Sequence, residues 1–337
     1  MIEGLQVGII GLGQIAQRGH IPGFQRAGAK VVAACDVNEA TAKQVCEKFG
    51  LTSYYTDWKT MLDEGGFGAV SICTPPSFHA EMAIECAGRG LHVLTEKPMA
   101  PSLEDCDRMI AASEENHVIL MVSHSQRYKG AHQTAKRIIQ TGRLGKPYMI
   151  QSVFGHPGPE KWSETGQWYF NPAVAQMGVM SDLGYHKLDL MQWLLDDQVV
   201  NIKAFMGTYE KDTTLEDSAA CVLHFKSGVI GTMLVSWDFK PDMDNSISIR
   251  FEKGALMVPA DDPNKLIIRE AFGTDRTEEM VYTNKSTDPS GWFGAISDFV
   301  KAVENGLPSP IPGTVGKQVM SLLHQAYESV SSGNLTI

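Results

Sequence analysis

The sequence lacks a long hydrophobic run. No window in its 337 residues approaches the roughly 18 uninterrupted apolar residues of a membrane-spanning helix. The first ten residues, Met1 to Ile10, also lack the basic start, apolar stretch and small-residue cleavage site of a secretory signal, and they look like a β-strand. We therefore expect a cytoplasmic protein that has no membrane partner.

Clustered cysteine is also absent. The six cysteines show no CxxC pair and no grouping with histidine, so they predict neither a zinc site nor a disulfide framework. Reduced core thiols are expected, as in most cytosolic proteins. No metal site is predicted.

Positive charge is scarce as well. Lysine and arginine total 29 against 39 acidic residues, which gives a formal net charge of -10. Because a negative protein repels phosphate backbones, we expect no nucleic-acid partner.

The length of the chain favours two domains, and the first half shows an alternating pattern. From residue 5 to about 122, short runs rich in β-branched residues alternate with amphipathic stretches, as in βαβ units of a doubly wound parallel sheet. The expected strands are Gln6–Ile10, Val31–Cys35, Ala69–Cys73, His92–Leu94 and Val118–Val122, and the expected helices include Glu39–Phe49, His79–Gly88 and Leu103–Glu115.

The second half shows a different pattern of predicted elements. After one helix, Gly130–Ile139, strand-like segments follow each other through turns, which predicts a mostly antiparallel sheet. We therefore predict an α/β Rossmann domain that binds NAD over residues 1–124, and an α+β domain with a large open sheet, for substrate binding and oligomerisation, over 125–337. The segments are Val199–Met206, Ser218–Phe225, Val229–Trp237, Ser246–Phe251 and Leu266–Glu270, with helices near Asp182–Leu195, Ala295–Glu304 and Thr314–Ser332 expected to cover one face.

The other face of that sheet has no helix predicted to cover it. Apolar residues such as Val222, Met233 and Val235, or their neighbours, would then form an exposed patch. This predicts a homodimer or homotetramer that assembles through the second domain.

A glycine-rich turn follows the first expected strand. Gly11-Leu-Gly13-Gln-Ile-Ala16 matches GxGxxA, in which one glycine permits the tight turn and the other lets the backbone approach a pyrophosphate. Asp36 ends the second strand, where an acid accepts hydrogen bonds from the adenosine ribose and repels a 2′-phosphate. NAD is favoured over NADP, although Asp36 could instead cap the next helix. The expected cofactor-binding residues here are Gly11, Gly13, Gln14, Ile15 and Asp36.

Two further strand ends carry polar residues. The carboxyl ends of strands in an open α/β sheet border the ligand crevice, so both segments should face the cofactor. The residues expected there are Thr74, Pro75 and His79 after one strand, and Glu96 and Lys97 after the next.

With a later Asp182-Leu-Gly-Tyr-His186 followed by Asp189, these motifs resemble the Gfo/Idh/MocA oxidoreductase family. Its signature combines GxGxxA, a TP loop, a Glu-Lys-Pro turn and AspxxxHis, and the resemblance spans nearly the whole chain. It implies an NAD(P)-dependent dehydrogenase or reductase acting on CH–OH groups of a sugar, cyclitol or sugar derivative. It also implies that Lys97 is catalytic, with Asp182 and His186 beside the nicotinamide.

Physical chemistry makes these roles reasonable. Loss of a hydride from an alcohol requires removal of the hydroxyl proton, and His186 suits that task because histidine titrates near neutral pH. Lys97 can stabilise a developing alkoxide, and Asp182 can orient the imidazole. On a regular helix Asp182, His186 and Asp189 share one face. The alternative is a core helix with a capping Asp182 and an incidental histidine.

Further substrate-binding candidates are His124 and Arg127, after the last strand of the first half, and Trp168, in the loop His156–Met177 with Trp162 and Tyr169. For Arg127 a structural salt bridge is equally expected. The aromatic loop predicts either a platform for a sugar ring or a plug over the core. Ser125, where relatives place Asn or Gln, and Ala175–Ser181, where many have a GGG-like run, depart from the family.

Two other functions remain open. One is a non-catalytic family member that senses the dinucleotide and regulates a partner protein, and the other is an enzyme that retains and recycles NAD while cleaving glycosides through a keto intermediate. Lys97 and His186 would have no use in the sensor, which favours an enzyme. The substrate and the direction of the reaction are not predicted.

Overall fold

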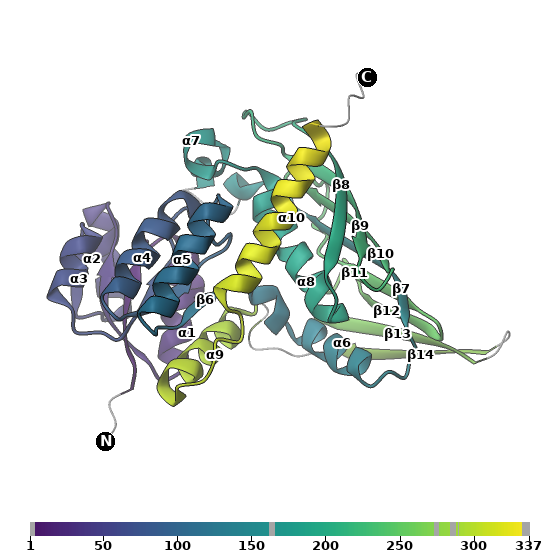
Figure 1. Cartoon of the computed structure of the whole chain (residues 1–337), viewed down its shortest axis with the longest axis horizontal. Coiled ribbons are helices and arrows are strands. Elements are labelled where there is room, and N and C mark those ends of the chain that lie inside the picture. Colours follow the sequence, from purple (N-terminus) through teal and green to yellow (C-terminus); the bar gives the residue numbers. More distant parts are fainter. Residues whose placement is uncertain (1–3, 162–165, 273–275, 284–287, 289, 332–337) are drawn as a thin grey trace. The chain divides into compact units, whose positions relative to one another are not determined.

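The computed structural model describes residues 4–161, 166–272, 276–283, 288 and 290–331. The chain divides into two compact units (Figure 1), the first formed by Met1–Ser125 and Trp292–Met320 and the second by Gln126–Gly291 and Ser321–Ile337. The division predicted from the sequence placed 292–320 in the second domain. The two units are described separately below.

The first unit contains a six-stranded parallel sheet in the order β3-β2-β1-β4-β5-β6, which confirms the predicted Rossmann fold. The strand order reverses beside β1, where doubly wound sheets bind their ligands. The three-residue β3 was not predicted, because so short a run shows no alternation. The strands are β1 (Gln6–Ile10), β2 (Lys30–Cys35), β3 (Ser53–Tyr55), β4 (Ala69–Ile72), β5 (His92–Thr95) and β6 (Leu120–Val122).

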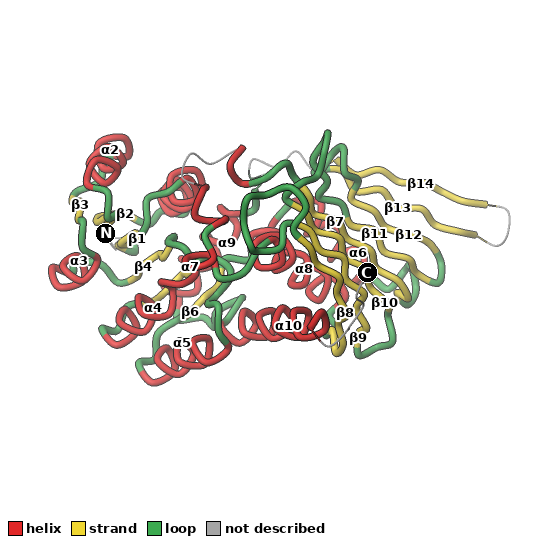
Figure 2. The backbone as a smooth tube through the Cα atoms, turned by 90° about the horizontal axis from the view of Figure 1, so that it is seen from above, coloured by secondary structure: helices red, strands yellow, loops and turns green. Residues whose placement is uncertain are grey.

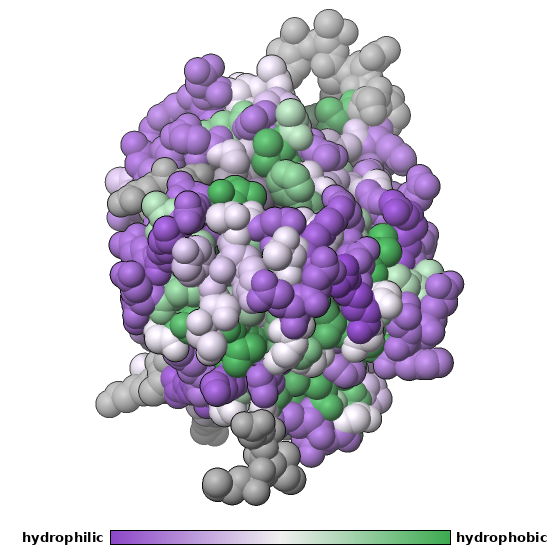
Figure 3. Space-filling model, turned by 90° about the vertical axis from the view of Figure 1, so that its left-hand side faces the viewer, coloured by the Kyte–Doolittle hydropathy of each residue, from purple (hydrophilic) through white to green (hydrophobic). Residues whose placement is uncertain are grey.

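The helices of this unit begin at local capping signals. Asn38 accepts the Thr41 N–H at 3.1 Å, and Ser102 accepts the Asp105 N–H at 3.0 Å. Helices α2 (Glu39–Phe49), α4 (His79–Gly88) and α5 (Leu103–Glu115) match the sequence prediction, whereas α3 (Trp58–Glu64) was missed. Figure 2 shows α4 and α5 side by side along the sheet. The outward face over α2 and α3 is mainly hydrophilic (Figure 3).

The helix after the glycine turn is irregular. Its residues Ala16–His20 form the π-helical turn η1, and α1 (Ile21–Arg26) completes it. Pro22 has no N–H to donate within the helix, and the turn widens just before it.

Helix α9 (Trp292–Asn305) packs on α1 in the first unit, so the prediction that it covers the large sheet was wrong. The rings of Phe24 and Phe299 meet edge to face at 6.2 Å. Gly23 leaves room for Ile296, whose Cδ1 lies 2.5 Å from where a Cβ at position 23 would stand. The apolar face of α9 therefore packs against α1, where Gly23 allows a close approach. Helix α10 (Gly313–Ser331) begins in the first unit and ends in the second.

The second unit contains an eight-stranded sheet in the order β14-β13-β12-β11-β7-β10-β9-β8. Only the pair β7 and β10 is parallel among the pairings of the described residues, which confirms a mostly antiparallel sheet. Strands β7, β12 and β14 were not predicted. The strands are β7 (Pro147–Gly155), β8 (Val199–Gly207), β9 (Ser218–Phe225), β10 (Ile230–Ser236), β11 (Ile247–Phe251), β12 (Gly254–Val258), β13 (Lys265–Phe272) and β14 (Arg276–Thr283).

The helices of the second unit are α6 (Gly130–Gln140), the four-residue α7 (Pro172–Ala175) and α8 (Tyr185–Leu195), which follows the π-helical turn η6 (Met180–Gly184). Leu188, Met191 and Leu194 are fully buried, whereas Leu195, which the amphipathic pattern of this helix also predicted to be buried, is half-buried. None of the helices among the described residues is long and apolar enough to cross a membrane.

The two faces of this sheet differ in exposure. Met233 and Val235 are buried, so their placement on the uncovered face was wrong, because alternate residues of a strand point to opposite faces. Val222 does lie on the uncovered face and is 56% exposed.

Candidate active site

The glycine turn after β1 fits a dinucleotide. Gly11 has φ +87°, and a Cβ there would lie 2.8 Å from the carbonyl carbon of Cys73, so this position requires glycine. At Gly13 no atom lies within 4 Å of the point where a Cβ would stand, which leaves its surface open. Gln14 and Ile15 begin the helix, and Ala16 is buried. Gln14 Oε1 is buried without a hydrogen-bond partner among the described residues.

Asp36 lies beside this turn. Its Oδ2 accepts the Leu12 N–H at 2.9 Å, and its Oδ1 accepts the Asn38 N–H at 2.9 Å. The N-cap of α2 is Asn38, so the capping role considered for Asp36 does not apply. With the open backbone at Gly13 and the positive end of the helix, the carboxylate makes this region suited to the phosphates and ribose of a dinucleotide.

The two polar strand ends are tied together by His79. Ile72 of β4 pairs with Thr95 of β5, so the segments that follow are neighbours. The ring of His79 is fully buried, with Nδ1 3.0 Å from the Pro98 carbonyl oxygen and Nε2 2.8 Å from that of Thr74. Burial lowers the pKa of His79, so near pH 7 the ring is neutral and donates its single N–H to one of these two carbonyls. The ring lies between the loops that follow β4 and β5 and contacts both.

The remaining candidates of the first unit lie at the same strand ends. Thr74, Pro75 and Lys97 are half-buried, whereas Glu96 is 8% exposed and His124, just beyond β6, is 2% exposed. The first unit thus brings together every predicted cofactor-binding residue on the glycine turn, at the end of β2 and on the two loops.

In the second unit, Asp182 lies within η6 and not in the regular helix that the sequence predicted. The indole Nε1 of the fully buried Trp237 donates to Asp182 Oδ2 at 2.9 Å. His186, in the first turn of α8, lies with its ring 6.0 Å from that of Phe154. Phe154 also contacts His156 at 6.2 Å. The wide turn means that the expected spacing of 100° per residue does not hold between Asp182 and His186.

The aromatic loop packs around the same tryptophan. Tyr169 and Phe170 meet the ring of Trp237 edge-on at 6.0 and 5.7 Å. Trp168 is half-buried and stacks on Tyr169 at 3.8 Å. Because Tyr169 and Phe170 pack on Trp237, they cover the core, as in the second of the two alternatives for this loop. Trp168 is then the candidate contact for a sugar ring. Trp162 lies outside the described residues.

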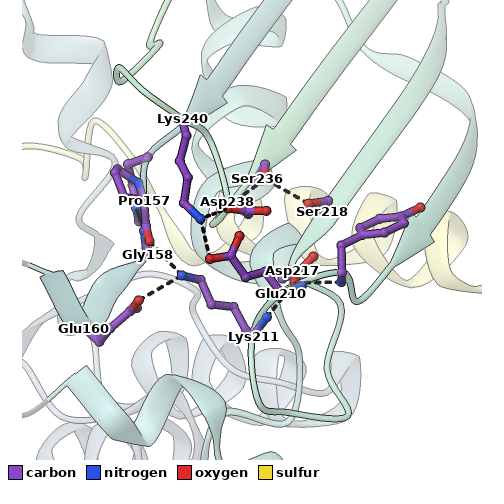
Figure 4. A network of polar contacts seen from close by, with 12 residues as sticks. Pro157, Gly158, Glu160, Glu210, Lys211, Asp217, Ser218, Ser236, Asp238 and Lys240 are labelled. Atoms are coloured by element: carbon purple, nitrogen blue, oxygen red, sulfur yellow. Dashed lines mark hydrogen bonds and ion pairs between the residues drawn. The ribbon is translucent and has the colours of Figure 1, made fainter.

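A polar network fixes this loop from the β8–β9 connection (Figure 4). Asp217 Oδ2 accepts three backbone N–H groups, from residues 209, 210 and 211, at 2.9, 2.8 and 3.0 Å. Lys211 Nζ then donates to the Pro157 carbonyl at 2.7 Å and to Glu160 at 2.8 Å. Thr213 Oγ1 also donates to the Phe170 carbonyl at 2.8 Å.

Arg127 forms a buried ion pair with Asp189. Its Nε donates to Asp189 Oδ2 at 2.8 Å, its NH2 group donates to Oδ1, and the two side chains are 13% and 3% exposed. The structural salt bridge considered for Arg127 is therefore present. Asp189, which was predicted to share a helix face with Asp182 and His186, is the ion-pair partner of Arg127.

Sequence reasoning missed three residues near the candidate site. His156 and Trp237 follow strand ends in the second unit, and His20 lies in η1 of the first unit. The sequence did not mark His156, because β7 was not predicted, and it placed Trp237 within the strand Val229–Trp237. No local signal reveals that His20 reaches Glu96, 76 residues away. Among the described residues, no three His, Cys, Asp or Glu side chains are placed to hold a metal ion.

A Rossmann sheet with a dinucleotide turn, a lysine at the strand edge and a second unit carrying an aspartate and a histidine define a class of nicotinamide-dependent oxidoreductases. Family models agree. Residues 5–124 match the oxidoreductase family with an NAD-binding Rossmann fold, and residues 132–257 match the GFO/IDH/MocA C-terminal domain. The chain belongs to the Gfo/Idh/MocA family of oxidoreductases, which confirms the predicted family, enzyme class and NAD cofactor.

Individual relatives cover nearly the whole chain. The myo-inositol 2-dehydrogenase of Thermotoga maritima is 25% identical over 97% of this chain and 96% of its own length. A structure of levoglucosan dehydrogenase in complex with NADH and levoglucosan has a TM-score of 0.89 at 20% identity, with 98% of each chain covered. A dehydrogenase from Bordetella pertussis in complex with NADH and UDP-GlcNAcA has a TM-score of 0.83 at 26% identity, covering 98% of this chain and 97% of its own.

The ion pair between Arg127 and Asp189 gives a stability prediction. Arg127→Ala should lower the free energy of unfolding by about 3–5 kcal/mol, because it leaves the Asp189 carboxylate buried without its counter-charge. The double variant Arg127→Met/Asp189→Leu removes both charges and should recover most of that loss. Urea denaturation at pH 7 measures both. A single variant no less stable than the double variant would contradict this account.

Proposed function

We propose that this protein transfers a hydride between NAD and a carbon bearing a hydroxyl or keto group, in a sugar, cyclitol or sugar derivative. The observation that carries the proposal is the placement of Lys97 on the sheet edge that also holds the glycine turn, together with an Asp182 oriented by Trp237. Relatives named for inositol and levoglucosan support the substrate class.

Each residue has a distinct task in this proposal. NAD, when bound, supplies the carbon that accepts or returns the hydride. His186 takes the hydroxyl proton during oxidation, and Lys97 stabilises the alkoxide through its ammonium group. Asp182 orients the histidine and is itself held by Trp237. Trp168 and His124 remain candidate substrate contacts, whereas Arg127 is committed to Asp189.

The two alternatives differ from this proposal in observable ways. A dinucleotide sensor would bind NAD and show no turnover with any polyol. An enzyme that recycles its NAD would cleave a glycoside without net NADH release. The direct test is a spectrophotometric NADH screen with cyclitols, aldoses, sugar acids, and deoxy and amino sugars. Strong NADH formation with one class supports the proposal, and no activity in either direction with all of them contradicts it.

The location of the protein in the cytoplasm, expected from the sequence, stays a prediction.

The catalytic roles predict a specific kinetic pattern. Lys97→Ala and His186→Ala should each lower kcat by at least roughly 100-fold, the scale of one proton-transfer or oxyanion contribution, while NAD affinity changes little. Asp182→Asn should cost less than His186→Ala. Oxidation should also slow as pH falls, because a protonated imidazole cannot accept the proton.

Steady-state kinetics and a melting curve for each variant check this pattern. If the helix is only structural, the variants should melt earlier but keep a near-normal kcat in the folded fraction. A stable, folded His186→Ala protein with wild-type kcat would refute the mechanism.

The position of Asp36 predicts tighter binding of NAD than of NADP. A 2′-phosphate would meet the carboxylate beside Leu12, and this like-charge contact should weaken NADP binding several-fold or more. Asp36→Ser should reduce the difference in affinity between NAD and NADP. Fluorescence titration with NADH and NADPH measures this difference, with Glu115→Ser, an exposed acid in the last turn of α5, as a matched control that leaves the preference unchanged. Tighter NADPH binding by the wild type would overturn the prediction.

We propose a homodimer or homotetramer formed through the uncovered face of the large sheet. The strand registers place Phe205, Val222, Leu234, Ile230 and Met149 on that face, and they are 69, 56, 40, 48 and 45% exposed. Exposed apolar side chains in such number are typical of an interaction surface. An isologous contact between two copies would bury them.

Light scattering tests this assembly. The wild type should have the mass of a dimer or tetramer at micromolar concentration, and Val222→Glu should shift it towards monomer. Leu307→Glu, an exposed residue just after α9 in the first unit, is the control and should not change the mass. A monomeric wild type would refute the proposal.

A further inference from the structure

A buried polar cluster lies directly behind the loop that carries Lys97, and the proposed chemistry does not use it. His20 comes from η1, Ser71 from β4 and Glu96 from the residue after β5, and the side chain of His20 is fully buried. His20 Nε2 lies 2.9 Å from Glu96 Oε1, and Nδ1 lies 2.7 Å from Ser71 Oγ. Three separate elements of the sheet layer therefore meet at one imidazole ring.

The cluster is an ion pair. Burial alone would lower the pKa of His20, but the nearby Cys73 and Glu96 outweigh it and raise the pKa to about 10. Burial would likewise raise the pKa of Glu96, and His20 and Lys97 lower it. At neutral pH both imidazole N–H groups then donate, one to Glu96 and one to Ser71. A buried carboxylate without such a partner would be costly.

The second oxygen of the same carboxylate reaches the catalytic loop. Glu96 Oε2 accepts the backbone N–H of Lys97 at 3.1 Å. The Glu96 carboxylate is thus fixed by His20 on one side and in turn holds the Lys97 backbone on the other. His20 also lies in the turn that follows the dinucleotide motif, so the two functional segments share one anchor.

We propose that His20 is a positioning residue that acts through Glu96 to hold Lys97 in the place from which its side chain works. The proposal rests on the function proposed above for Lys97. Its physical basis is that a shift of about 1 Å in a catalytic group can cost up to roughly 100-fold in rate. Ser71 is the internal control, because it touches His20 without touching Glu96 or Lys97.

Kinetics provides the first test. His20→Gln and Glu96→Gln should each lower kcat by roughly 10- to 100-fold with little change in the dissociation constant of NADH, whereas Ser71→Ala should lose less than about threefold. Because the pair acts as a unit, the double variant should be no slower than the slower single variant. If His20→Gln does not fold, His20→Asn takes its place. If the loss of kcat in the double variant equals the product of the two single losses, His20 and Glu96 act independently, which would contradict the proposal.

Hydrogen exchange provides a test that needs no substrate. The Lys97 amide is protected by Glu96, so His20→Gln should speed its exchange at pH 7 by about tenfold or more, while Ser71→Ala and peptides of β6 stay unchanged. If Lys97→Met keeps wild-type kcat, the proposed function of Lys97 fails, and the exchange rate still decides whether His20 holds the loop. If Lys97→Met is inactive and His20→Gln changes neither kcat nor exchange, only the positioning proposal falls.

The charge of His20 gives a pH signature. Its raised pKa means that the stabilisation is complete below about pH 6.5, the ordinary value, and is lost as pH rises through about 10. The stability difference between the wild type and His20→Gln should therefore shrink from pH 7 to pH 10. Cys73, Glu96 and Lys97 are the other titratable groups of the cluster. Because Cys73 is the largest of the causes that raise the pKa of His20, the same series in Cys73→Ser should show the stability difference shrinking at a lower pH than in the wild type. A difference that grows with pH would overturn the ion pair.

Discussion

The site depends on one constraint, which is that parallel strands of a sheet end at a common edge. Strands β1, β2, β4 and β5 are neighbours, so Gly11, Asp36, Thr74 and Lys97 follow strand ends that lie side by side although they span 87 residues of sequence. The register fixes this directly, since Ile10 pairs with both Cys35 and Ile72, and Ile72 pairs with Thr95. The hydrophobic strands therefore bring the polar loops together.

Loops at such an edge would be mobile without further contacts, and buried side chains supply these. His79 joins the Thr74 and Pro98 carbonyls, and His20 holds Glu96. In the second unit Trp237 holds Asp182, and Asp217 gathers three backbone N–H groups. Each anchor is a polar group removed from water, so its loss leaves an unsatisfied partner. The same groups that stabilise the fold thereby fix where the chemical groups stand.

Local signals explain how much the sequence could predict. The bounds of α2, α4 and α5 were predicted to the residue, because caps and helix stops lie within a few residues of the ends. The motif residues were also accessible, since each follows a strand end. Strand β12 was not predicted because its five residues show no polar–apolar alternation, and β14 was not predicted because its first four residues, Arg-Thr-Glu-Glu, are all polar.

Contacts between distant residues could not be predicted in this way. His79 reaches Pro98 across 19 residues, Trp237 reaches Asp182 across 55, and α9 joins α1 from the far end of the chain. The π-helical turns at Ala16–His20 and Met180–Gly184 depend on packing and not on composition. Each turn carries a residue with a proposed role, the positioning residue His20 in the first and Asp182 in the second, and the regular helical periodicity assumed for the second turn was wrong.

A crystal structure of the protein with bound NADH tests the central claim most directly. The account predicts the pyrophosphate on the Gly11–Gly13 turn, the adenosine ribose against Asp36, and the nicotinamide with Lys97 and His186 within hydrogen-bonding reach of one substrate-sized space beside it. A dinucleotide bound elsewhere, or a nicotinamide that Lys97 and His186 cannot both approach, would contradict the account.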